Sequence, residues 1–142
     1  MKIYADSSFL VSLYSADANF GAASRTMQAA RGRCFLTTLG KLEVVNAFGL
    51  RVFRKEVSAA QAEFSIIDFE NDLRDGILQL QGLSDSLFDR ARQLSRQTTA
   101  KLGARTADLL HVAAALELGA DYLYSFDQQQ RKLARTLHLK LN

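Results

Sequence analysis

Short apolar runs alternate along the chain with longer segments in which apolar residues recur every three or four positions. A short apolar run bounded by polar or glycine residues predicts a β-strand, and the wider spacing predicts an amphipathic helix. The predicted strands are Lys2–Ala5, Arg33–Thr37, Ile77–Gln81, Tyr122–Ser125 and Leu139–Leu141. The pattern therefore indicates strands separated by helices along the whole chain.

Capping residues mark where these helices begin and end. Aspartate, serine and threonine favour helix starts, and glycine favours helix ends. The predicted helices begin after Asp6 or Ser7, near Phe20, near Leu42, after Ser58 with Gln61, after Ser84, at Thr106, and after Asp127 with Gln130. The predicted end signals are Gly32, Gly103 and Gly119.

Strands joined by long helical segments require right-handed crossovers, which produce a parallel sheet covered on both faces. We therefore predict an α/β fold, a three-layer α/β/α sandwich with a central, mainly parallel sheet. No linker, repeat or low-complexity segment interrupts the pattern, so residues 1–142 are expected to form a single domain. The longest apolar run, Leu109–Leu116, is too short to span a bilayer, and no export signal is visible, so we expect a cytoplasmic protein.

Cysteine and histidine are too few for two common kinds of site. Cys34 is the only cysteine, which excludes an internal disulfide, and its apolar neighbours predict a buried thiol. His111 and His138 do not complete a tetrahedral zinc site with it.

The net charge of +3 is mild, but the basic residues are unevenly distributed. The segments Arg90–Ala107 and Gln128–Asn142 contain arginines and lysines and no acidic residue. Each is a candidate phosphate-binding surface, or alternatively the solvated face of an amphipathic helix.

Four acidic residues are expected at one edge of the predicted sheet. Asp6 and Asp127 follow strands, whereas Glu43 and Asp108 lie in the first turns of helices. The carboxyl ends of parallel strands form the usual functional crevice of such folds. Each acid alone would be an ordinary cap or polar surface residue, but four together repel one another and predict a bound divalent cation. Oxygen ligands without histidine or cysteine favour Mg²⁺ or Mn²⁺.

These motifs together resemble a known family. Asp6-Ser7-Ser8 after an apolar strand, Glu43 one turn before Asn46, and the segments Arg105–Ala115 and Tyr122–Asp127 occur in the order of a PIN domain. Within that family the motifs resemble specifically the VapC-type toxins of bacterial toxin–antitoxin pairs, and the resemblance covers nearly the whole chain.

The resemblance implies a Mg²⁺- or Mn²⁺-dependent endoribonuclease, a hydrolase in which the four acids hold the metal and the attacking water. It implies supporting roles for Ser7, Asn46 and Ser125, and a contact between Arg105 and substrate phosphate, although Arg105 also reads as a surface arginine. Phe126 stands where relatives frequently have a polar or basic residue, which argues against a substrate contact there. Either Asp108 or Glu43 is a candidate to accept the proton of the water.

The same resemblance implies three partners: an RNA substrate of the transfer or ribosomal class, a small antitoxin protein and a second copy of the chain. The helix predicted over Ser58–Asp75 and the helix before it are candidate contact surfaces, with Phe53 or Phe64 as anchors. Phe53 shares the face of Val52 and is predicted to lie in the core. The position of Phe64 is left open.

Two other protein classes that carry acidic residues at strand ends fit this sequence less well. A phosphoacceptor receiver domain needs an acid pair after the first strand, and a haloacid-dehalogenase-type phosphatase needs an aspartate where Ser8 stands. Glycine patterns for dinucleotide or P-loop binding are absent. The remaining alternative is a non-catalytic RNA-binding or assembly module on the same fold. An RNA-binding module would gain from losing the four acids, so their presence favours catalysis.

Overall fold

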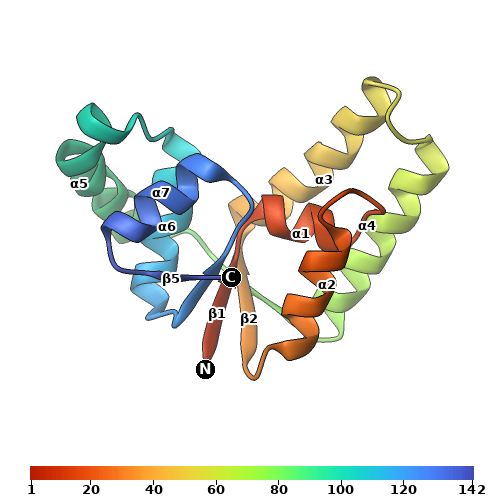
Figure 1. Cartoon of the computed structure of the whole chain (residues 1–142), viewed down its shortest axis with the longest axis horizontal. Helices are drawn as coiled ribbons and strands as arrows, with labels where there is room; N and C mark the ends of the chain where they lie inside the picture. The colour runs from red at the N-terminus through yellow and green to blue at the C-terminus, as the bar shows by residue number, and fades with distance from the viewer.

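The computed structural model describes residues 1–142 and contains one sheet of five parallel strands (Figure 1). The strands are β1 (Lys2–Ala5), β2 (Arg33–Thr37), β3 (Leu78–Gln81), β4 (Tyr122–Tyr124) and β5 (Lys140–Leu141), in the spatial order β3-β2-β1-β4-β5. The strand β1 therefore lies at the centre, between β2 and β4. The predicted α/β fold and parallel sheet are confirmed.

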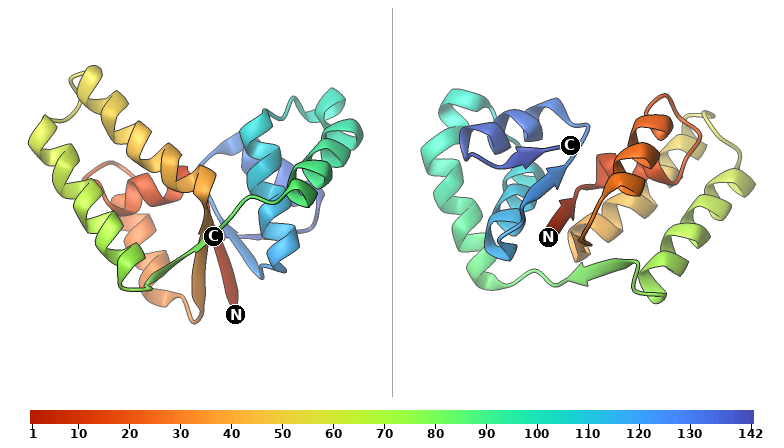
Figure 2. Two further views of the ribbon diagram at one scale, coloured as in Figure 1. Left: turned by 180° about the vertical axis from the view of Figure 1, so that it is seen from behind. Right: turned by 60° about the horizontal axis from the view of Figure 1, so that its bottom comes forward.

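Seven helices cover the two faces of this sheet. They are α1 (Ser7–Leu13), α2 (Phe20–Ala29), α3 (Thr38–Phe53), α4 (Ala59–Arg74), α5 (Asp85–Leu102), α6 (Thr106–Leu118) and α7 (Gln128–Thr136). Helices α1–α4 lie on one side of the strands and α5–α7 on the other, as the views of Figures 1 and 2 agree. The predicted three layers are therefore present.

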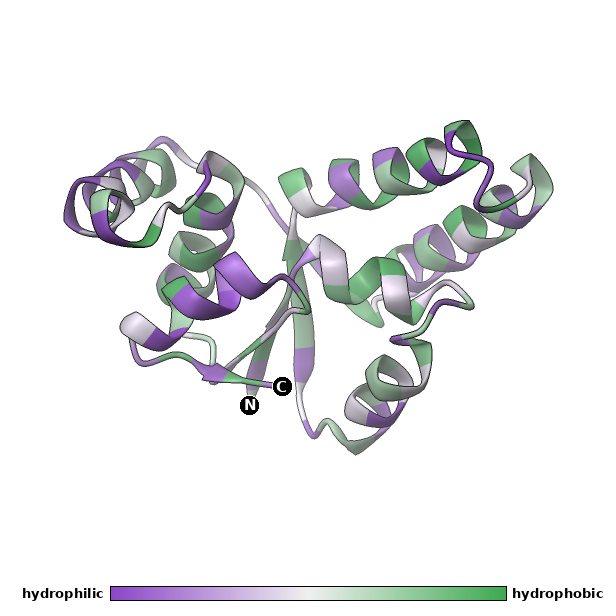
Figure 3. Ribbon diagram, turned by 45° about the horizontal axis from the view of Figure 1, so that its top comes forward, coloured by the Kyte–Doolittle hydropathy of each residue, from purple (hydrophilic) through white to green (hydrophobic).

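Each face of the sheet packs into its own apolar core. In β1 the side chains alternate, so that Ile3 and Ala5 join the core under α1–α4, whereas Tyr4 joins the core under α5–α7. Figure 3 shows hydrophobic and hydrophilic residues alternating around the flanking helices. No helix is long and apolar enough to cross a bilayer.

The predicted caps are confirmed at four helix starts and at two helix ends. Asp6, Ser58, Ser84 and Asp127 each accept a backbone N–H bond at the start of a helix. At the other ends of helices α5 and α6, Gly103 and Gly119 adopt left-handed backbone angles, with φ of 65° and 64°. A residue with a Cβ atom is strained in that conformation, which explains glycine at both positions.

The role predicted for Gly32 is wrong. Helix α2 ends earlier, at Ala29, and its cap residue Ala30 is extended rather than left-handed. A Cβ atom on Gly32 would lie 2.2 Å from the carbonyl oxygen of Met1. Glycine is therefore required at this position by the close approach of two backbone segments and not by a helix end.

The exposure of two phenylalanines corrects a second prediction. Phe53, expected in the core, is 83% exposed at the end of α3, and Phe64 on α4 is 70% exposed. Helix α3 starts at Thr38, one turn before the predicted start near Leu42, and its last turn extends beyond the part that packs on the sheet. Cys34, in contrast, is buried as predicted, and burial raises the pKa of its thiol to about 12.

Candidate functional site

The four predicted acids line one small pocket at the carboxyl edge of the central strands. This acid pocket has a volume of about 180 Å³. Its lining residues are Asp6, Ser7, Ser8, Glu43, Arg105, Ala107, Asp108, His111, Asp127 and Gln130. They come from both helical groups, because Ser7, Ser8 and Glu43 belong to α1 and α3, whereas the residues from Arg105 onward precede or belong to α6 and α7. The fold thus brings distant parts of the chain to one place.

Asp6 is the most enclosed acid of the pocket, with 1% of its surface exposed. Its Oδ1 accepts hydrogen bonds from the Phe9 backbone N–H at 2.9 Å and from the Ser8 hydroxyl at 2.7 Å. Its Oδ2 accepts a bond of 2.6 Å from the Ser125 hydroxyl. Burial raises the pKa of Asp6, although these hydrogen bonds act in the opposite direction. The side chain therefore caps α1 while it lines the pocket.

Two serines join the end of β4 to the start of α1. Ser125 Oγ accepts the Asp127 backbone N–H at 3.1 Å, and Ser8 Oγ accepts the Phe126 backbone N–H at 2.9 Å. The sequence pointed to Ser125 and to Ser7, but Ser7 lines the pocket without a side-chain hydrogen bond. The second residue of α1 rather than the first turns back towards Asp6, so Ser8 makes the contacts expected of Ser7.

Arg105 bridges two of the acids. Its Nε and Nη2 donate to the two carboxylate oxygens of Asp108, each at 3.0 Å, and Nη2 also donates to Asp127 at 2.6 Å. The Arg105 backbone N–H adds a bond of 3.0 Å to Asp108. The Asp108 side chain is 3% exposed and that of Arg105 is 61% exposed, so the guanidinium covers the pocket from the solvent side.

The guanidinium also affects the acidity of Asp127. Partial burial acts to raise the pKa of this carboxyl, but hydrogen bonds from Arg105 and from the Gln130 backbone N–H hold the pKa below its usual range. Asp127 is therefore a carboxylate at neutral pH, as a cation ligand must be.

Glu43 is held by a chain of hydrogen bonds that the sequence did not suggest. Its Oε1 lies 2.5 Å from His111 Nε2, and His111 Nδ1 lies 2.7 Å from the Tyr4 hydroxyl. Thr37 Oγ1 accepts the Gly40 backbone N–H and lies 3.3 Å from the same hydroxyl. The consistent assignment has Thr37 donating to Tyr4, Tyr4 donating to Nδ1, and Nε2–H donating to Glu43. This chain fixes the orientation of Glu43.

Besides Ser8, the sequence reasoning missed His111 and Gln130 among the polar residues of the pocket. His111 lies one turn after Asp108 on α6, so its spacing places both on the same helix face. Gln130 is 2% exposed, and its Nε2 has no hydrogen-bond partner. Asn46, which was expected to support the site, is exposed on α3 and lies outside the lining of the acid pocket.

The donor set of the acid pocket fits a hard divalent cation. All four acids offer carboxylate oxygens, which Mg²⁺ and Mn²⁺ prefer. The unpaired atom of Gln130 is its Nε2, which donates hydrogen bonds and is not a ligand for such an ion. In the observed arrangement no three histidine, cysteine, aspartate or glutamate side chains lie close enough to share one ion. The guanidinium of Arg105 stands between Asp108 and Asp127, and an ion bound to both would take its place.

Comparisons with known proteins agree with this description of the fold. The crystal structure of VapC20 from Mycobacterium tuberculosis, described as a Sarcin-Ricin loop cleaving toxin, is similar with a TM-score of 0.70 and 17% identity, over 92% of this chain and 93% of that one. VapBC-1 from nontypeable Haemophilus influenzae is similar with a TM-score of 0.65 and 17% identity, over 100% and 97% of the two chains.

At these identities the likeness concerns the fold. Comparison with curated proteins gives no significant sequence match. The model of the PIN domain family, however, matches residues 3–136, which include all four acids and, apart from Lys2, every strand except the last. The chain therefore belongs to the PIN domain family.

Proposed function

We propose that the protein is a metal-dependent endoribonuclease that hydrolyses RNA phosphodiester bonds and serves as the toxin of a toxin–antitoxin pair. One observation carries the proposal: Asp6, Glu43, Asp108 and Asp127 line a single pocket at the carboxyl edge of the sheet. Membership of the PIN family and the likeness to a toxin described as cleaving the sarcin-ricin loop support RNA as the substrate.

The four carboxylates would hold Mg²⁺ or Mn²⁺. When bound, such an ion neutralises charge on the phosphate and activates water for attack. Ser8 and Ser125 orient Asp6 for this task, and His111 orients Glu43. No covalent nucleophile is needed.

Glu43 is the better placed of the two candidate proton acceptors. Asp108 would bind the ion in place of the Arg105 guanidinium, and its Oδ2 also keeps the hydrogen bond from the Arg105 backbone N–H. Glu43 accepts one bond, at Oε1, and its side chain is 30% exposed. A carboxylate with a free oxygen that reaches solvent can take a proton from water, which favours Glu43.

Basic side chains around the acid pocket would attract RNA towards it. Exposed basic residues lie on α5, on α7 and at the mouth of the pocket, namely Arg90, Arg92, Arg96, Lys101, Arg105, Lys132 and Arg135. Long-range attraction by such residues offsets repulsion between phosphate and the acids. Arg105 is the one among them that touches the acids, so it is our candidate for a direct phosphate contact.

The toxin role implies an antitoxin, and we expect a homodimer in the cytoplasm. The structural likeness to VapBC-1 supports a protein partner. Phe53 and Phe64, exposed on α3 and α4, are candidate anchors for either contact, because large exposed apolar side chains are enriched where proteins bind one another.

The test is cleavage of total cellular RNA by the purified chain in Mg²⁺, in Mn²⁺ and in excess chelator. Asp6→Asn and Asp108→Asn proteins should lose cleavage while they keep the circular dichroism spectrum of the folded chain. Asp75→Asn, which changes an exposed acid at the end of α4, is the matched control and should cleave normally.

Discrete, metal-dependent fragments that disappear in both pocket variants would support the proposal and supply ends for mapping the target. Cleavage by both variants at the rate of the unaltered chain, from preparations shown to be free of contaminating nuclease, would contradict the assignment of the site. Absence of cleavage with either metal, from folded protein free of inhibitor, would favour the non-catalytic RNA-binding module.

A further inference from the structure

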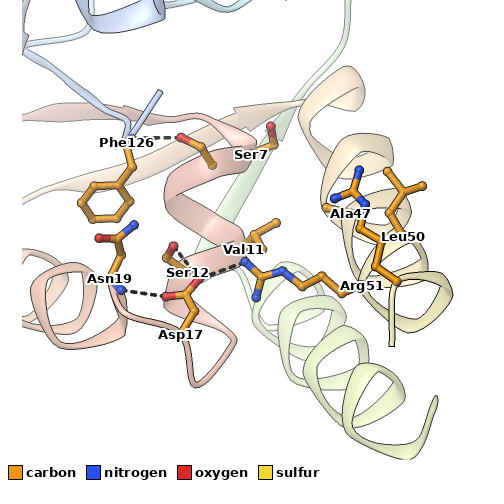
Figure 4. A pocket seen from close by; sticks show the side chains of 11 residues that line it. Ser7, Val11, Ser12, Asp17, Asn19, Ala47, Leu50, Arg51 and Phe126 are labelled. Atoms are coloured by element: carbon orange, nitrogen blue, oxygen red, sulfur yellow. Dashed lines mark hydrogen bonds and ion pairs between the residues drawn. The ribbon is translucent and has the colours of Figure 1, made fainter. Parts of the chain in front are cut away.

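A second hollow borders the acid pocket. This Phe126 pocket has a volume of about 370 Å³ and shares Ser7 and Ser8 with the acid pocket (Figure 4). Phe126, Asn19 and Arg54 are among its lining residues, most of which are polar or charged. Its volume lies within the range of small-molecule sites.

Phe126 supplies a supported aromatic surface in this pocket. Its ring stacks on that of Phe9, with centroids 5.5 Å apart and planes inclined by 23°. The Phe126 backbone N–H donates to Ser8, which fixes the start of the loop after β4. The ring is only partly buried, and its chain neighbours Ser125 and Asp127 both contact acid-pocket residues. A rigid aromatic surface therefore lies one residue from the acids.

The polar groups of the pocket differ in whether they are already paired. Arg51 is engaged, because its guanidinium donates to Asp17 and Ser15, each at 3.0 Å. Arg54 is exposed at the end of α3 and forms no ion pair. The side-chain amide of Asn19 makes no hydrogen bond within the chain, and Figure 4 shows it beside the ring of Phe126. An unpaired cation and an unpaired amide thus line the same pocket as the aromatic surface.

We propose that the Phe126 pocket binds a nucleotide of single-stranded RNA next to the bond that is cleaved. The base stacks on Phe126, its polar edge faces Asn19, and a phosphate contacts Arg54. Single-stranded RNA is recognised in this way, by aromatic stacking combined with amide and cationic contacts. The position of the cleaved bond in this inference rests on the proposed RNA hydrolysis. The inference also reverses the expectation, drawn from the sequence, that Phe126 makes no substrate contact.

The experiment measures binding without cleavage. A short single-stranded RNA carrying 2-aminopurine is titrated with the protein in excess chelator, because the emission of this base falls when it stacks on an aromatic ring. Phe126→Leu keeps an apolar side chain but removes the aromatic face, and should weaken binding about tenfold, the equivalent of about 1.4 kcal/mol, and abolish the change in emission. Phe126→Tyr should retain both.

The phosphate contact has its own test. Arg54→Gln should weaken binding and lower the slope of log affinity against log salt by about one. Lys55→Gln removes the neighbouring charge outside the pocket, and Phe88→Leu removes an exposed phenylalanine of α5 that does not line it. Both controls should bind as the unaltered chain does.

The results of these titrations distinguish failure of the proposed nucleotide site from failure of the proposed RNA hydrolysis. Binding that is unchanged in Phe126→Leu, or no binding of single-stranded RNA at all, would overturn the proposal even where RNA is cleaved. Loss of binding in Phe126→Leu and Arg54→Gln but not in the controls would support it. That support would stand even if no metal restored cleavage, in which case the hydrolase proposal alone would fail.

Discussion

The contacts of Arg105 allow a quantitative prediction about Arg105→Gln. The change removes the guanidinium bonds to Asp108 and Asp127 but keeps the backbone N–H bond to Asp108. Because the Arg105 side chain is 61% exposed, solvent screening reduces each ion pair to below about 1 kcal/mol, and the two pairs together to about 1–2 kcal/mol. Thermal unfolding without metal should therefore occur about 3–6 °C lower than in the unaltered chain.

The free energy that the Arg105 ion pairs contribute to folding should also oppose metal binding. A cation that binds Asp108 and Asp127 must displace the guanidinium in the unaltered chain, whereas Arg105→Gln has no such competitor. Its affinity for Mn²⁺, measured by calorimetric titration, should be about 5- to 30-fold higher, and saturating Mn²⁺ should raise its unfolding temperature more than that of the unaltered chain.

Arg74→Gln provides the control for both measurements. It removes a guanidinium that is paired with Asp75, where both side chains are more than half exposed and lie at the end of α4. Neither its unfolding temperature nor its Mn²⁺ affinity should change appreciably. Equal Mn²⁺ affinity in Arg105→Gln and the unaltered chain would refute the reasoning, because Arg105 would then not compete with the ion.

Two further substitutions test the buried polar groups of the site. Burial raises the pKa of Asp6, so the folded chain holds this proton more tightly than the unfolded chain and loses stability as pH rises through the raised pKa. Asp6→Asn keeps a capping side chain and should therefore unfold at a higher temperature than the unaltered chain at pH 7. The difference between the two unfolding temperatures should shrink as pH falls. A lower unfolding temperature of Asp6→Asn at pH 7 would contradict this reasoning. Tyr4→Phe leaves His111 Nδ1 without its partner and should cost about 1–3 kcal/mol in urea unfolding. It should also move the His111 ring nitrogen signals in NMR spectra, and unchanged signals would exclude the hydrogen bond.

Sequence reasoning located the four acids because their positions follow from local signals. The first predicted strand is followed directly by Asp6, and the strand predicted over Tyr122–Ser125 is followed by Asp127 after one residue, which places both acids at the carboxyl edge of a parallel sheet. Helix starts account for Asp108, and for Glu43 within the first turns of α3. The predicted fold class and these positions therefore depend on neighbouring residues alone.

The features that sequence reasoning missed depend on contacts between distant segments. His111 sits in an apolar stretch of α6, and its partners Tyr4 and Glu43 are 107 and 68 residues away. Glycine at position 32 is explained by its close approach to the Met1 backbone, a contact that residue spacing in the sequence does not predict. Phe53 continues the apolar periodicity of α3, but the periodicity does not say where the neighbouring layer ends.

Because the chain is synthesised from its N-terminus, the acid pocket can form only late in synthesis. Ser125 and Asp6, which are joined by a hydrogen bond, are 119 residues apart, and β4 pairs with the central β1 late in the sequence. A chain still emerging from the ribosome carries Asp6 and Glu43 but lacks the strand that holds Asp6 in place. Under the proposed activity, a nascent chain stays inert towards the ribosome and messenger that produce it until nearly all of it has been synthesised.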